Sequence, residues 1–222
     1  MRKTTSNNEP SGLSITTAWL SLAASVAALL CLAGLHFLSP EFDPSWRVVS
    51  DFALGSYGWV LALMVTAWEL SSWTLAFAQW PAMETNGGKA GLVLIGIAGL
   101  GEALASVFDL RSPALHGLAG ALGIPTLPIA AILISVALSH SQVCSSARRV
   151  LLLTANLTWI SFVLMVAAML TLTRRIRGFR LPIGWPNRLL VAIYLAWAIT
   201  VAWKRIRLRG KISRPIETSS LL

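Results

Sequence analysis

Residues 90–138, AGLVLIGIAGLGEALASVFDLRSPALHGLAGALGIPTLPIAAILISVAL, decide the fold of this chain. They contain two apolar runs, 90–108 and 118–138, each close to the ~20 residues that a helix needs to cross the hydrocarbon core of a bilayer. A short connector, DLRSPALHG, separates the two runs. The stretch therefore predicts an antiparallel pair of membrane-spanning helices.

Four more apolar runs extend this pattern over most of the chain: 13–38, 52–77, 150–173 and 189–203. The last run covers only about 23 Å at 1.5 Å per residue, so Arg188 and Lys204 would have to reach toward the two interfaces. A half-buried helix lying along the interface is the alternative there. The prediction is an all-α, polytopic integral membrane bundle of six transmembrane helices.

Composition supports a membrane protein: of 222 residues, 55% are hydrophobic and 12% are charged, about half the charged share of a soluble domain. We expect a disordered cytoplasmic N-terminus over residues 1–12, a six-span membrane domain over 13–203 and a basic cytoplasmic tail over 204–222. The first apolar run is too long for the core of a signal peptide and should stay attached.

Lys and Arg residues predict the orientation, because they are retained on the cytoplasmic side. Six spans with a cytoplasmic N-terminus place eleven of the 18 basic residues inside. Five spans with the N-terminus outside would place thirteen inside, but would leave the uncharged run 189–203 out of the bilayer core. We therefore predict six spans with both termini cytoplasmic.

The net charge of +9 could indicate nucleic-acid binding, since the tail is strongly basic. Beside a membrane, basic residues instead contribute about 1 kcal/mol each to the attraction of anionic lipid headgroups. The expected partners are therefore membrane lipids, with anionic headgroups at the tail, and not nucleic acid.

A few ionisable residues lie in or beside the spans, where they are costly unless paired or functional. Glu102 and Asp109 are two helical turns apart, so both lie on one face of the third span, near its outer end. Glu69 is predicted near the inner boundary instead. The predicted polar cluster at the outer side comprises Asp51, Glu102, Asp109, His116 and Arg188.

Several interpretations of this cluster stay open. Asp51 could cap the second helix, and the carboxylates could pair with nearby arginines in a purely structural network. His36, Asp109 and His116 are conceivable zinc ligands, but the chain has no His pair at helical spacing. No metal or other cofactor is predicted.

Glycine and proline distinguish the central pair of spans. Glycines recur in both runs of residues 90–138 and allow close helix packing, so we expect a tight hairpin. They lack the strand, turn and Lys-Ser/Thr of a phosphate-binding loop. Pro125 and Pro128 remove backbone hydrogen bonds and predict a kink in the fourth span.

Three segments resemble one known family. The run 50–60, SDFALGSYGWV, is similar to the entry of helix 2 in the domain-of-unknown-function 998 family of small prokaryotic membrane proteins. The stretch 99–120, GLGEALASVFDLRSPALHGLAG, resembles its third helix and the entry of its fourth, although the proline that commonly follows the phenylalanine is absent after Phe108. Residues 184–197 resemble its Arg-led final span, with Asn187 where an acidic or amide residue often stands. The resemblance implies six helices and matches motif positions at Ser50, Asp51, Gly55, Gly58, Asp109, His116, Gly117 and Arg188, but it implies no established activity.

Two functions remain as hypotheses. The first is a non-enzymatic membrane protein for small-solute or lipid transport, sensing or an accessory role, with the polar cluster at its outer mouth. The second is an intramembrane lipid hydrolase, possibly zinc-dependent, with Asp109, His116 and Ser50 as candidate catalytic residues. The small number of histidines favours the first.

Overall fold

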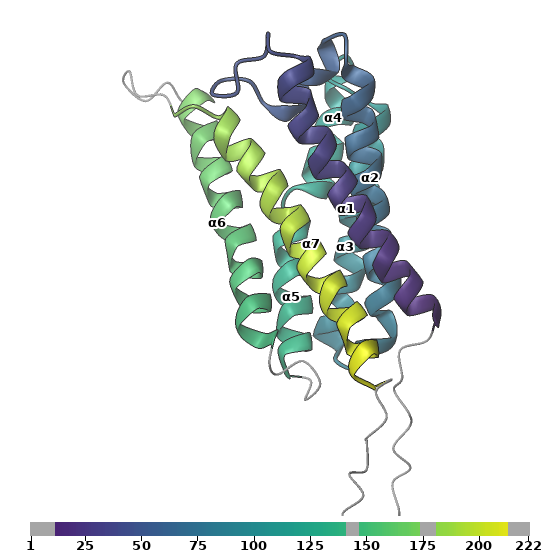
Figure 1. The fold of residues 1–222 in the computed structure, drawn as a ribbon. Coiled ribbons are helices and arrows are strands. Elements are labelled where there is room, and N and C mark those ends of the chain that lie inside the picture. The colour runs from purple at the N-terminus through teal and green to yellow at the C-terminus, as the bar shows by residue number, and fades with distance from the viewer. Residues whose placement is uncertain (1–11, 141–146, 174–180, 213–222) are drawn as a thin grey trace, which may run out of the picture.

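A computed structural model describes residues 12–140, 147–173 and 181–212 (Figure 1). The described chain has six candidate spans that are long and apolar enough to cross a membrane, and two of them, Gly58–Ala82 and Pro113–His140, each consist of two consecutive helices. This confirms the prediction of an all-α bundle with six candidate spans. The α-helices are α1 (Gly12–Leu38), α2 (Gly58–Gln79), α3 (Asn86–Val107), α4 (Pro113–Gly123), α5 (Thr126–His140), α6 (Arg148–Thr173) and α7 (Gly184–Ile212), with 3₁₀ helices η1 (Val49–Leu54) and η2 (Trp80–Ala82).

The helices run up and down, and each packs on its neighbours in the chain (Figure 1). The last helix, α7, closes the bundle by packing on both α1 and α6. Trp197, Tyr194 and Phe52 are the largest fully buried side chains of the core. We call the end formed by residues 39–57, 108–112 and 181–184 the upper end, as in Figure 1, and the opposite end the lower end. The polar residues predicted for the outer side belong to the upper half.

Two helix boundaries differ from the predicted ones. The second span was expected from residue 52, but residues 49–54 form η1 and α2 begins at Gly58. The last span was expected over 189–203, whereas α7 covers Gly184–Ile212. Arg188 therefore lies inside a helix that is long enough to cross, and the short interfacial helix is not observed.

The fourth span is broken between α4 and α5, as the two prolines predicted. Pro128 has no N–H to donate to the carbonyl of Ile124 four residues earlier. The hydroxyl of Tyr194 on α7 donates to this carbonyl instead, at 3.0 Å. The Thr126 hydroxyl bonds the carbonyls of Leu122 and Gly123. Side chains thus replace the missing backbone bonds at the break.

Removal of the Tyr194 hydroxyl should destabilise the bundle. In Tyr194→Phe the Ile124 carbonyl loses its donor within the membrane-spanning region, and we expect a loss of about 1 kcal/mol in the free energy of unfolding. The other tyrosine of the chain, Tyr57, lies at the surface with 36% exposure. Unfolding titrations in mixed detergent–SDS micelles should therefore find Tyr57→Phe close to the wild type. Equal losses in the two variants would contradict the proposed bond.

Candidate functional site

Arg188 is the centre of the polar contacts at the upper end, although only 5% of it is exposed. Its Nε donates to Nε2 of His36 at 2.6 Å. Its Nη1 donates to the carbonyl oxygens of Arg47, at 2.6 Å, and Gly184, at 3.1 Å. The guanidinium also lies over the Phe52 ring, 5.5 Å from its centroid. Arg188 thereby ties α7 to α1 and to the connector between α1 and α2.

The two bonds of His36 fix its protonation state. Its Nδ1 lies 2.7 Å from the carbonyl oxygen of Leu32, which can only accept, so Nδ1 carries the proton. Its Nε2 faces the Nε of Arg188, which can only donate, so Nε2 must be the acceptor. His36 is therefore a neutral imidazole in this arrangement, and its acceptor nitrogen is used by Arg188.

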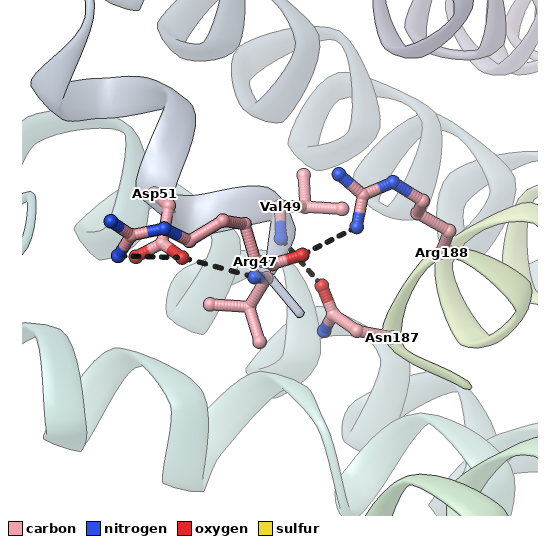
Figure 2. A network of polar contacts seen from close by, with 6 residues as sticks. Arg47, Val49, Asp51, Asn187 and Arg188 are labelled. Atoms are coloured by element: carbon pink, nitrogen blue, oxygen red, sulfur yellow. Dashed lines mark hydrogen bonds and ion pairs between the residues drawn. The ribbon is translucent and has the colours of Figure 1, made fainter. Parts of the chain in front are cut away.

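Asn187 and Asp51 hold the turn that leads into η1 (Figure 2). Asn187 Oδ1 accepts from the Val49 amide at 2.7 Å, and Asp51 Oδ2 accepts from the Val48 amide at 3.1 Å. Asp51 Oδ2 also lies 3.9 Å from Nη1 of Arg47. Asp51 thus caps η1, and the expectation that it caps the second spanning helix is corrected.

Asp109 and His116 hold the connector between α3 and α4. Asp109 accepts from the amide and the Nη1 of Arg111, at 2.8 and 2.9 Å. The Nδ1 of His116 lies 3.0 Å from the carbonyl oxygen of Phe108, and therefore donates to it. The five residues of the predicted polar cluster therefore do not form one network.

A cavity of about 140 Å³ lies below the upper end, between η1, α2, α3, α4 and α7. Its wall is mainly apolar and includes Trp68. The polar side chains among its lining residues are Ser50, Glu102, His116 and Asn187. The cavity thus brings together two members of the predicted cluster, Glu102 and His116, with Ser50, a predicted catalytic candidate.

Glu102 is the acidic residue of the cavity wall, and it is only 5% exposed. The Ser72 hydroxyl of α2 donates to its Oε2 at 2.8 Å. Its other oxygen, Oε1, is buried and has no hydrogen-bond partner among the described residues. Glu69 lies near the middle of α2, within electrostatic range of Glu102. The expectation that Glu69 lies near the inner boundary is therefore wrong.

The conceivable metal ligands are used separately. His36 bonds to Arg188, Asp109 pairs with Arg111, and His116 bonds to Phe108. Within residues 12–140, 147–173 and 181–212, no group of three or more His, Cys, Asp or Glu side chains could hold a metal ion. This geometry gives no support to the alternative that His36, Asp109 and His116 bind zinc.

Some residues of the site were not predicted. Ser72 orients Glu102, and Asn187 both lines the cavity and holds η1. Ser72 is one of many serines in the apolar runs, so its type gives no signal. Asn187 directly precedes the predicted Arg188, and its place in the family resemblance was the available signal.

One comparison with known protein families found a match. The model of a family described as protein of unknown function (DUF998) matches residues 22–204, which includes every lining residue of the cavity. No curated protein and no solved structure matches the chain.

Proposed function

The chain belongs to the DUF998 family of multi-pass membrane proteins, and from this premise we propose that it is a non-enzymatic protein that binds a small solute in the cavity below its upper end. Binding there would serve transport or sensing. A single observation carries the proposal: Glu102 lines the cavity, and one of its carboxyl oxygens is buried without a hydrogen-bond partner among the described residues.

Three general rules support this interpretation. Buried polar atoms in proteins are nearly always hydrogen-bonded, and an unpaired one requires an explanation. An ionisable group within a membrane-spanning helix usually marks a functional site. A mainly apolar cavity with a few convergent polar groups is also the usual form of a small-molecule site. A solute that hydrogen-bonds to Oε1 of Glu102 would satisfy all three.

The hydrolase hypothesis receives less support. Ser50 and His116 both line the cavity, but within the described part of the chain no hydrogen bond joins them. A serine nucleophile needs an adjacent base to activate it. Asp109, the third candidate, pairs with Arg111 on the connector instead of lining the cavity. The arrangement fits binding better than catalysis.

Filling the cavity tests the proposal. Gly120 of α4 lines the cavity, and a Cβ built on it would meet only the end of the Ile124 side chain, at 3.8 Å. Gly117, one turn earlier, has open space and does not line the cavity. In a thermal-shift screen of small neutral, cationic and anionic solutes, Gly120→Leu should abolish stabilisation by any ligand of the cavity, whereas Gly117→Leu should retain it. A screen without any solute sensitive to Gly120→Leu would refute the proposed function.

We further propose that the lower end faces the cytoplasm of a prokaryotic cell and contacts anionic lipid headgroups. Arg207 of α7 lies over the Trp203 ring, 4.9 Å from its centroid, which places a basic and an interfacial aromatic side chain together. A reporter fused after Leu222 should be active only in the cytoplasm, and activity outside it would overturn this orientation. The basic residues of the described chain near the lower end are Lys89, Arg148, Arg149, Lys204, Arg205, Arg207, Arg209 and Lys211.

A further inference from the structure

We propose that the solute of this cavity is a small primary ammonium ion, whose charged group binds Oε1 of Glu102 and whose short alkyl part fills the apolar wall. The inference rests on the proposed function and specifies its ligand.

Charge distinguishes a cation from an anion. Among the described residues that line the cavity there is a carboxyl group, Glu102, and no lysine or arginine. Arg188 does not line the cavity: its Nε and Nη1 bond to His36 and to the carbonyls of Arg47 and Gly184, while its Nη2 is buried and has no hydrogen-bond partner among the described residues. An anion would therefore lack a charged partner here, whereas an ammonium ion would gain one.

The hydrogen bonds already made leave acceptors for such a ligand. Ser72 donates to Oε2 of Glu102 and leaves Oε1 without a partner. His116 uses Nδ1 as a donor to Phe108, so in the neutral form of the imidazole its Nε2 is an acceptor. A primary ammonium has three N–H donors, and the carboxyl, imidazole and hydroxyl groups of the wall are its natural acceptors.

The size of the cavity limits the ligand. An engineered apolar cavity of about 150 Å³ holds a benzene molecule, and this cavity measures about 140 Å³. A ligand of about six non-hydrogen atoms therefore fits, such as an ammonium group with a chain of four carbons. The indole of Trp68 also belongs to the wall, and aromatic rings attract cations.

Two sources could supply this chemistry: a free amine, or the primary ammonium of an ethanolamine headgroup in the surrounding lipid. The cavity lies close below the upper end, within reach of a headgroup region. Both sources share the ammonium group and the contact with Glu102, so the experiment must separate them.

Isothermal titration of the full-length protein in lipid-free detergent tests the class of ligand. n-Butylammonium should bind, and 1-butanol and butanoate should bind more than about tenfold more weakly, because they lack the charge or carry the opposite one. Glu102→Gln keeps the shape of the side chain and should weaken n-butylammonium by more than about tenfold. Glu69→Gln removes a carboxyl group that does not line the cavity and should change the affinity by less than about threefold.

Repetition in nanodiscs identifies the source. If the affinity for n-butylammonium is the same in phosphatidylcholine and phosphatidylethanolamine nanodiscs, the ligand is a free amine. If binding is lost only in phosphatidylethanolamine nanodiscs, the ligand is the headgroup. Wild-type affinity in Glu102→Gln, or equal binding of 1-butanol, would overturn the inference. If butanol or butanoate binds and Gly120→Leu blocks it, the proposed function survives and only the ligand class fails. If no probe is blocked by Gly120→Leu, both fail.

Discussion

Arg188→Ala should produce the largest loss of stability of any single substitution at the upper end. It removes the donors to His36 and to the Arg47 carbonyl, and each buried acceptor left without a partner costs about 1–3 kcal/mol. It also removes the contact with the Phe52 ring. We expect the free energy of unfolding in mixed detergent–SDS micelles to fall by about 2–5 kcal/mol.

Two further variants make this expectation specific. Arg188 contacts the backbone of Arg47, whose side chain is 57% exposed. Arg47→Ala therefore keeps the bond and should cost no more than about 1 kcal/mol. Arg188→Lys keeps the charge but not the planar arrangement of donors, and should lie between Arg188→Ala and the wild type. If Arg47→Ala is as damaging as Arg188→Ala, the contacts of Arg188 do not hold this end together.

Gly101→Ala should separate α3 from α4. A Cβ at this position would lie 2.5 Å from the Gly123 amide nitrogen and 2.7 Å from the Ala119 carbonyl oxygen. Both are backbone atoms of α4, so no side-chain rotation can relieve the contact. Overpacking of this kind costs about 1–3 kcal/mol, and the same unfolding assay should detect it.

Gly96, on the same helix, provides the matched control. A Cβ built on Gly96 meets nothing within 4 Å. Gly96→Ala should therefore be neutral, or stabilise the protein by about 0.5–1 kcal/mol through its higher helix propensity. Equal destabilisation by the two substitutions would mean that α3 tolerates no alanine for reasons other than its contact with α4.

Most of the fold could be predicted because hydropathy and run length are local properties of a sequence. The broken fourth span and the close pair of α3 and α4 followed from prolines and glycines in the same way. The ends of α7 could not be predicted in this way, because charged residues were taken as the boundaries of the span. Arg188 and Arg205 lie inside the helix because residues far away in sequence, such as His36 and Ser14, bond them.

The site was predictable only in part. Residue type and helical spacing placed Glu102 and His116 in the upper half, and the structure brings them to one cavity. Asp109 has the same kind of side chain and lies on the same predicted helix face, but in the structure it bonds to Arg111 on the connector. Glu69 was placed too deep because its depth was counted from residue 52, whereas α2 begins at Gly58. Side-chain direction in connectors and the start of a helix after a 3₁₀ turn depend on tertiary contacts.

The break between α4 and α5 has a consequence for biogenesis. At 1.5 Å per residue, α4 spans about 17 Å and α5 about 23 Å, so neither alone crosses the ~30 Å hydrocarbon core. Residues 113–140 must therefore insert into the membrane as one segment. The Ile124 carbonyl obtains its donor from Tyr194, which the ribosome adds only after two further connectors. The fourth span is thus inserted early, but it can be completed only when the last helix of the chain has been synthesised and has docked.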